Sequence, residues 1–304
     1  MEDFMIVGLL AATLRVATPL ILGTLGELFA ERAGILNLGI EGTMFCGAFV
    51  GFVIGGATGY LWFGVLAAII TGIFAGLLMG LMSVRLGVSQ HVSGLGITLL
   101  LTGLSLFGFR LIYGEPRIPP SIEPFARLSI LGQVPILGEI LGQYALTYIA
   151  LVLVPVCWWV LYRTNFGLQI RAVGENPEAA DAAGVNVFLT RYLALAIAGG
   201  LMAAGGAFLS LAQLGAFTYG IIAGRGWVCI ALIIFANWQP VRVLWGAILF
   251  GGVFALQLRL QTIGLDLPYE AFLALPYLVT IAALAMAGRN AAYPAALLKA
   301  YKRE

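Results

Sequence analysis

Residues 42–84 read GTMFCGAFVGFVIGGATGYLWFGVLAAIITGIFAGLLMGLMSV, a run without a single charged side chain. One apolar helix needs about 20 residues to cross a bilayer, so this run is long enough for two crossings. Barrel strands would alternate apolar and polar positions over about ten residues, and this run does not alternate. The sequence therefore predicts an all-α polytopic membrane protein. Similar uncharged runs occur at 86–109, 140–162, 192–224 and 271–288.

The composition supports this class and excludes several kinds of site. Of 304 residues, 61% are hydrophobic and 10% are charged, whereas soluble domains carry about 25% charge. The only lysines are Lys299 and Lys302, so the chain has no G-x-x-x-x-G-K-[ST] phosphate loop, and any ATP must bind to another chain. The three cysteines lie in apolar runs and are expected to pack without reactive roles. A single histidine cannot build a His-rich metal site, so we expect no metal or cofactor on this chain.

The apolar runs predict about nine transmembrane helices in one transmembrane domain that covers residues 1–304. The seventh of them is short and carries Arg225 near its start. The expected spans are Met5–Leu28, Ile40–Ala57, Leu61–Val84, Val92–Ile112, Ile140–Leu161, Tyr192–Gln213, Ile221–Asn237, Val243–Leu258 and Ala271–Gly288.

The distribution of positive charge predicts the orientation. With the N-terminus outside and the C-terminus inside, ten Lys and Arg residues lie on inner segments and four on outer ones. This agrees with the positive-inside rule. Two connections are long: residues 114–139 outside and residues 162–191 inside.

Glycines recur at every fourth position on two of the expected spans. They are Gly47, Gly51, Gly55 and Gly59 on the second span, and Gly72, Gly76 and Gly80 on the third. Because lipid provides no hydrophobic drive between helices, small residues mark the faces where helices approach closely. These positions predict a tightly packed bundle.

The inner loop contains the string RAVGENPEAADAAG at residues 171–184. Asn176 is a favourable helix N-cap and Pro177 suits the first helical position. Glu178 then lies near the positive end of the helix dipole, and Gly184 suits the C-terminal cap. A two-turn helix is marginal in water by itself. We therefore expect it to dock, either on a partner protein or on this chain's own helices.

This loop resembles the E-A-A-x-x-x-G loop of ABC importer permeases, through Glu178, Ala179, Ala180 and Gly184. The wider string is similar to the ribose, branched-chain amino-acid and nucleoside branch of these permeases. A second string, ERAGILNLGIEG at residues 31–42, resembles the segment after the first span in nucleoside and simple-sugar importer permeases. The two motifs follow the order of the family, so the resemblance covers essentially the whole chain.

The resemblance implies a type II ABC importer permease fold with an inverted repeat. It also implies a non-enzymatic permease subunit for nucleosides or related simple sugars in the bacterial plasma membrane. A partner ATPase would bind ATP and Mg²⁺, and an extracytoplasmic binding protein would deliver the substrate. A second, longer permease would pair with this one, because this chain lacks the first helix of ten-span ribose permeases. No nucleic-acid partner is expected. The residues implied to couple to the ATPase are Gly174, Glu175, Asn176, Pro177, Glu178, Ala179, Ala180 and Gly184.

Two alternative functions were weighed against this one. A permease for branched-chain amino acids would share the inner-loop motif. An ion-coupled secondary transporter would need carboxylates at mid-membrane, whereas the acids here gather near Glu27, Glu31 and Glu41 and near Asp266 and Glu270. That distribution makes a poor proton relay and leaves the E-A-A loop unexplained.

Three polar residues are candidates for the translocation pathway. Asn37 and Glu41 flank a glycine-rich interruption, where unwound backbone survives at membrane depth only if it is buried in protein or lines a cavity. The alternative is a plain cytoplasmic turn in water, and the sequence does not decide between the two. Arg15 lies midway along the first span, where a charge is costly, so it faces the protein interior or water. Glu27 and Glu41 are its candidate partners, and a structural ion pair or carbonyl contact is favoured over a pathway role.

Overall fold

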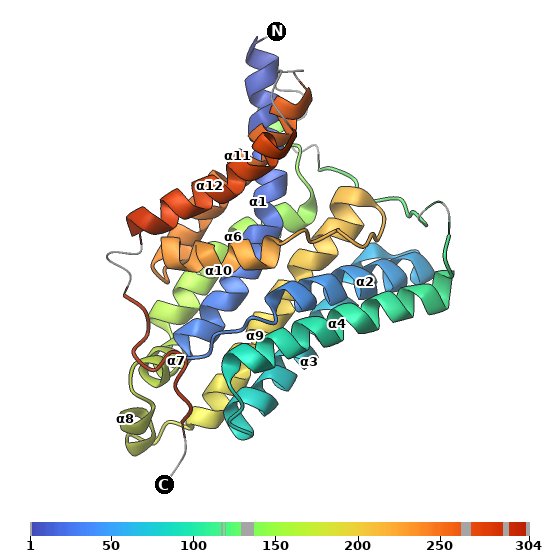
Figure 1. The fold of residues 1–304 in the computed structure, drawn as a ribbon. Coiled ribbons are helices and arrows are strands. Elements are labelled where there is room, and N and C mark those ends of the chain that lie inside the picture. Colours follow the sequence, from blue (N-terminus) through green and yellow to red (C-terminus); the bar gives the residue numbers. More distant parts are fainter. Residues whose placement is uncertain are drawn as a thin grey trace.

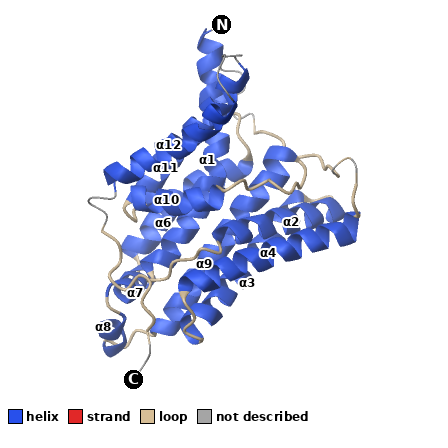
Figure 2. Ribbon diagram, in the orientation of Figure 1, coloured by secondary structure: helices blue, strands red, loops and turns tan. Residues whose placement is uncertain are grey.

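The computed structural model of the chain is a bundle of helices (Figures 1 and 2). It describes residues 2–116, 118, 120–128, 137–262, 269–287 and 292–301. The helices are α1 (Glu2–Arg32), α2 (Ile40–Thr58), α3 (Leu61–Gly80), α4 (Gln90–Tyr113), α5 (Leu137–Leu141), α6 (Ala145–Arg163), α7 (Asn165–Glu175), α8 (Pro177–Ala182), α9 (Val187–Phe208), α10 (Arg225–Ala236), α11 (Pro240–Thr262) and α12 (Tyr269–Ala287), with π-helical turns at η1 (Leu81–Arg85) and η2 (Leu209–Leu214).

The predicted spans correspond to helices along the chain. Within the described residues, seven helices are long and apolar enough to cross a membrane: α1, α2, α3 with η1, α4, α6, α9 with η2, and α11. The predicted ninth span overlaps α12, while its last residue, Gly288, lies outside the described residues.

The predicted seventh span, Ile221–Asn237, is wrong as a continuous membrane-spanning helix. Its helical part is α10, of 12 residues, which is about 18 Å long and too short for a hydrocarbon core of about 30 Å. Non-helical backbone at residues 215–224 precedes α10. Gly215 binds the amide of Ile122 in the 114–139 connection (2.8 Å), and the Trp238 carbonyl binds Arg32 Nη2 at the end of α1 (2.8 Å). The segment therefore connects the two ends of the bundle through an unwound stretch followed by a short helix.

Helix α9 lies at the centre of the bundle, because small residues bring three other helices against its backbone. A Cβ at Gly47 of α2 would overlap the Ala203 carbonyl, and Cβ atoms at Gly72 and Gly76 of α3 would overlap the carbonyls of Gly199 and Leu195. These contacts confirm the predicted packing of both glycine stripes on neighbouring helices. Gly59 is an exception, since it ends α2 and has no neighbour within 4 Å.

The two halves of the chain repeat one arrangement with opposite polarity. Gly26 of α1 lies against Ala198 of α9, and Gly205 lies against the carbonyl of Pro19, so α1 and α9 run antiparallel. Helix α1 packs on α10 and α11, while α9 packs on α2 and α3; α2 contacts α4, and α10 contacts α12. Each long helix is followed by an interruption, at 33–39 or 215–224. The expected inverted repeat therefore pairs α1–α4 with α9–α12.

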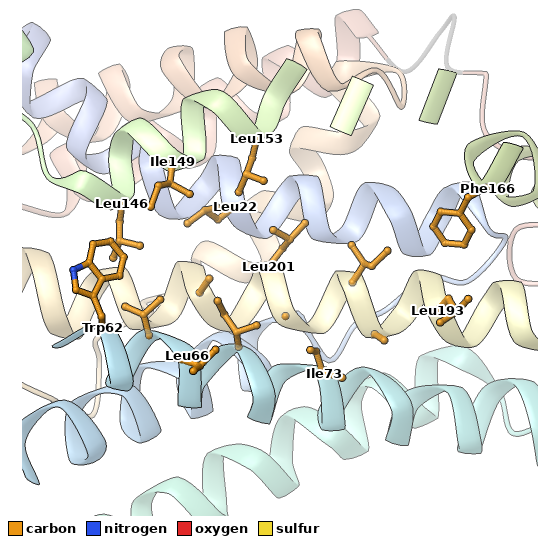
Figure 3. A pocket seen from close by; sticks show the side chains of 16 residues that line it. Leu22, Trp62, Leu66, Ile73, Leu146, Ile149, Leu153, Phe166, Leu193 and Leu201 are labelled. Atoms are coloured by element: carbon orange, nitrogen blue, oxygen red, sulfur yellow. The ribbon is translucent and has the colours of Figure 1, made fainter. Parts of the chain in front are cut away.

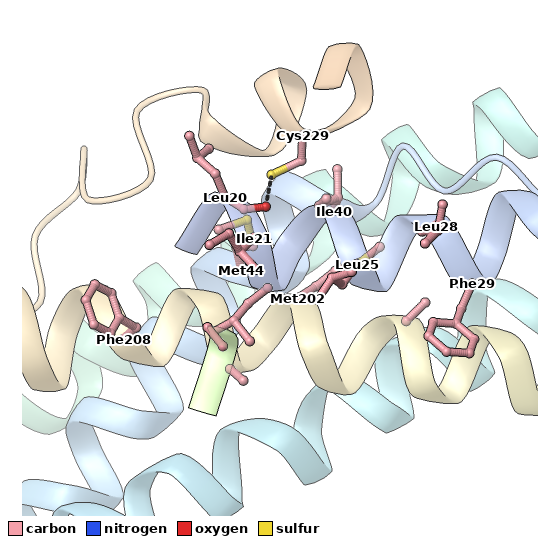
Figure 4. Close-up of a cluster of buried hydrophobic side chains, with 14 of the residues drawn as sticks. Leu20, Ile21, Leu25, Leu28, Phe29, Ile40, Met44, Met202, Phe208 and Cys229 are labelled. Atoms are coloured by element: carbon pink, nitrogen blue, oxygen red, sulfur yellow. Dashed lines mark hydrogen bonds between the residues drawn. The ribbon is translucent and has the colours of Figure 1, made fainter. Parts of the chain in front are cut away.

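The apolar core lies where α1, α2, α9 and α10 meet (Figure 4). Leu20, Leu25, Met44 and Met202 are all buried there. The Cys229 thiol is fully buried and donates to the Leu20 carbonyl at 3.7 Å, as Figure 4 shows. Cys46 and Cys157 are also buried and free, as expected of packing residues.

The packing predicts unequal tolerance to the same substitution at two glycines. Gly72→Leu places a side chain into the α9 backbone and is expected to destabilise the protein by at least about 1–3 kcal/mol, the range for overpacking. Gly103→Leu on α4 has no neighbour within 4 Å and should be nearly neutral. Thermal unfolding of the purified protein in detergent measures both. Equal melting temperatures would contradict the close approach of α3 to α9.

Candidate functional site

The inner loop folds as its capping residues predict. The Asn176 side chain accepts the Ala179 amide at 3.0 Å, and Pro177 occupies the first turn of α8. Gly184 follows with φ +86°, a left-handed conformation that favours glycine. Its amide binds the Asp181 carbonyl at 2.9 Å. Short-range hydrogen bonds therefore define both ends of α8.

One side of α8 packs on its own chain and the other is exposed. Ala180 is buried with Val173 and Val187, and Tyr301 packs beside them. Gly174 is buried against the Arg32 carbonyl. Pro177 is half-buried, and the exposed residues of this loop are Glu175, Asn176, Glu178, Ala179, Ala182, Ala183 and Gly184. The helix thus presents a mixed polar and small-residue face.

The interruption at 33–39 is buried in protein. The Leu36 amide donates to Gln90 Oε1 (2.8 Å), and Thr98 Oγ1 donates to the Leu38 carbonyl (3.0 Å). The Asn37 amide donates to Glu27 Oε1 at 2.7 Å. Side chains from α1 and α4 therefore satisfy this backbone, as membrane-depth irregular structure requires.

Asn37 is 2% exposed, and its side chain turns back to accept the Gly39 amide at 3.0 Å. Glu31 is also 2% exposed. A plain turn in water is therefore wrong for this segment. In this conformation Asn37 supports the interruption from within, and its place in the pathway stays a prediction.

Glu41 joins the interruptions of the two halves. Its Oε1 accepts the Gly224 amide at 2.9 Å and its Oε2 accepts the Gly226 amide at 2.7 Å. The carboxylate thus lies at the N-terminus of α10, where the helix dipole and free amides favour negative charge. The backbone of Glu41 also lies against Gly226, so closely that a Cβ there would overlap it. The first turn of α2 therefore meets the first turn of α10.

Arg15 is not paired with either of its two predicted partners. Glu27 binds the Asn37 amide, and Glu41 binds the α10 amides. Nη1 of Arg15 is buried and, over the residues that the structure describes, has no hydrogen-bond partner. The interior position agrees with the expectation, and neither candidate carboxylate pairs with Arg15.

Sequence reasoning missed the polar residues that tie these segments together. Glu31 accepts the Trp238 indole N–H at 2.6 Å, and Arg32 Nε donates to the Trp238 carbonyl at 3.1 Å. Buried Arg191 donates from Nε to the Ala33 carbonyl at 3.1 Å. The sequence could have indicated these contacts, because Glu27 and Glu31 lie in or beside an apolar span. A carboxylate there costs free energy unless it has a partner.

A lateral groove of about 790 Å³ runs between α1, α3, α6 and α9 (Figure 3). Its sixteen lining residues include Leu22, Trp62, Leu153, Phe166 and Leu201, and only glycine and apolar side chains line it. A binding site for a polar solute needs convergent hydrogen-bonding groups. This groove therefore suits apolar chains, and it is a poor site for a sugar or a nucleoside.

Residues 9–284 match the family described as branched-chain amino acid transport system, permease component. The chain belongs to this family. The resemblance drawn from the 31–42 and 171–184 motifs is thereby confirmed, and so is the polytopic permease fold.

Named relatives span nearly the full chain. A putative glucose ABC transporter permease of Haloferax volcanii, TsgC13, is 43% identical over 98% of both chains. The guanosine ABC transporter permease NupQ of Bacillus subtilis is 37% identical over 90% of this chain and 89% of its own. The nucleoside ABC transporter permease NupC of Lactococcus lactis is 33% identical over 89% of both.

A second Bacillus subtilis guanosine permease, NupP, is more distant. It is 28% identical over 78% of this chain but only 66% of its own length. NupP is therefore longer than this chain.

Removing the Glu41 carboxylate should loosen the start of α10. Each hydrogen bond to a charged group contributes about 1.5–3 kcal/mol, so Glu41→Ala is expected to lower the melting temperature and speed hydrogen exchange at Gly224 and Gly226. Glu115→Ala provides the control, because its contact with Arg110 (3.8 Å) joins side chains that are 72% and 82% exposed and contributes little. Unchanged hydrogen exchange at Gly224 and Gly226 in Glu41→Ala would contradict the stabilisation of α10 by the Glu41 carboxylate.

Proposed function

We propose that this chain is a permease subunit of an ATP-driven importer for nucleosides or related simple sugars. The observation that carries the proposal is α8, a capped helix of six residues whose exposed face carries Glu178 and Ala179 of the E-A-A motif. A helix this short has little stability by itself, and an outward face of small residues suits a groove in another protein. We assign that groove to an ATPase subunit that binds ATP and Mg²⁺.

The coupling residues in this proposal are Gly174, Glu175, Asn176, Pro177, Glu178, Ala179, Ala180 and Gly184. Glu175, Glu178 and Ala179 lie on the exposed side and would contact the ATPase. Ala180 is buried and Gly174 packs on Arg32. These two residues would link α8 to the rest of the permease.

The pathway is assigned to the region where the two interruptions meet. Asn37, Glu41 and Arg15 remain its candidate polar residues. Glu41 fits this role best, because its carboxylate bridges the two halves and lies beside half-buried Arg225. In inverted-repeat transporters, substrate sites lie near the bilayer midplane at the interface of the two repeats, where discontinuous helices form them.

The substrate is proposed from the relatives. One is named for glucose, one for guanosine and one for nucleosides, so nucleosides come first, simple sugars second and branched-chain amino acids third. The existence of a longer guanosine permease beside NupQ supports pairing of this chain with a second, longer permease.

The proposed orientation has the N-terminus outside and the C-terminus in the cytoplasm of a bacterial inner membrane. It rests on ten positive residues inside against four outside. An extracytoplasmic binding protein would dock on the outer face, where residues 114–139 offer a long connection with both signs of charge.

Reversing one charge on the exposed face of α8 tests the coupling role. Glu178→Arg is expected to abolish solute uptake while membrane insertion stays normal, because this side chain is exposed and makes no hydrogen bond or ion pair with the other residues that the structure describes. Glu270→Arg, an exposed residue in the first turn of α12 that lies outside both the α8 loop and the 114–139 connection, serves as the matched control and should leave uptake unchanged. Normal uptake by Glu178→Arg would exclude the coupling role.

The subunit composition tests the proposal directly. The chain, purified gently from its native membrane, should bring with it an ATPase and a longer permease, identified by mass spectrometry. If the chain is isolated alone and moves solute in vesicles without ATP, the importer proposal fails and a secondary transporter replaces it.

A further inference from the structure

Residues 292–301 lie against the α7–α8 loop, as the red segment beside α7 in Figure 1 shows. The Ala296 amide donates to the Gly174 carbonyl at 2.8 Å, and the Ala295 amide donates to Glu175 Oε2 at 3.3 Å. The Tyr301 hydroxyl donates to Asp181 Oδ2 at 2.9 Å. The segment is therefore bound both before α8 and within its last turn.

The same segment contacts the base of the broken helices. The Ala292 amide donates to Asn237 Oδ1 at 2.9 Å, in the turn between α10 and α11. Ala296 is 3% exposed, and its carbonyl oxygen lies 3.1 Å from the position of a Cβ at Gly34. Gly34 has φ +85° and begins the 33–39 interruption. One residue, Ala296, thus touches both the loop before α8 and the start of the interruption.

Other contacts make this junction stiff. The Tyr301 ring packs on Phe188 with ring centroids 5.8 Å apart. Gly174 lies against the Arg32 carbonyl, and Arg32 binds the Trp238 carbonyl. The α8 helix itself buries only Ala180. Its direct packing on the bundle is therefore small, and the 292–301 segment adds a second attachment.

We infer that residues 292–301 form a strap that transmits movement of α8 to the interruption at 33–39. The inference rests on the proposed function, because it takes α8 as the helix that the ATPase moves. Tyr301 is then a positioning residue, since it touches neither solute nor nucleotide. Its hydrogen bond fixes the strap to α8, while Ala296 and Ala292 fix it to the base of the pathway.

The test uses the complete complex with its ATPase and second permease, reconstituted in liposomes. The readouts are solute uptake per ATP hydrolysed and the amount of ATPase that copurifies. Tyr301→Phe removes the hydroxyl and keeps the ring, and Tyr301→Ala removes both. Tyr293→Ala is the control, because this tyrosine in the same segment is 66% exposed.

Tyr301→Phe is expected to lower solute uptake per ATP hydrolysed, because it removes the hydrogen bond to Asp181, and Tyr301→Ala should lower it further, because it also removes the ring contact with Phe188. The amount of ATPase that copurifies with both Tyr301 variants should equal that of the unmodified complex. The Tyr293→Ala variant should equal the unmodified complex in both readouts. Because Tyr301→Phe keeps the ring contact with Phe188, it remains informative if Tyr301→Ala fails to fold.

Two results would contradict the inference that the strap transmits movement of α8, and both would leave the proposed function in place. One is an unchanged uptake-to-ATP ratio in both Tyr301 variants. The other is loss of the ATPase from the complex, which would make the segment part of a docking surface. A wild-type complex that contains no ATPase would overturn the proposed function, and the strap with it.

Discussion

In an apolar environment every backbone amide outside a helix needs a partner within the protein, and the centre of this permease is organised by that requirement. Among the described stretches outside helices, those at 33–39 and 215–224 each follow one of the two crossing helices, α1 and α9 with η2. Their polar groups are met by side chains from distant parts of the chain: Glu27 and Gln90 for the first, and Glu41 for the second. A carboxylate or an amide at these positions thus replaces the regular helical ladder, and it holds the two halves in register.

The crossing of α1 and α9 provides the rigid frame for these interruptions. Glycine and alanine bring the helices into backbone contact, which places the end of each long helix beside the broken helix of the opposite half. In an apolar stretch of 18 residues within α9 and η2, 78% of the residues are buried. In the corresponding stretch of α4, only 17% are buried. The single chain therefore has a closed interior and a broad apolar outer surface.

The sequence predicts most of the helices and the inner loop, because both depend on local information. Uncharged length predicts the helices, and Asn176, Pro177 and Gly184 predict α8 through capping. It could not predict the shortening of the seventh span, because an uncharged run does not distinguish a helix from unwound backbone that is satisfied elsewhere. Nor could it pair Glu41 with Gly224 and Gly226, which lie 183 and 185 residues away. For the same reason it could not decide whether Glu27 or Glu41 pairs with Arg15, since local sequence does not show which backbone amides bind a carboxylate.

The bridge from Glu41 to the start of α10 has a consequence for how a hydrated passage would arise. If the two halves separate there, a carboxylate and two amides lose their partners, and in a dry interior each would be costly to expose. Water or a hydroxyl-bearing solute can replace those partners. Separation at this point would therefore require wetting, because the molecules that entered would have to replace the hydrogen bonds of Glu41 to Gly224 and Gly226.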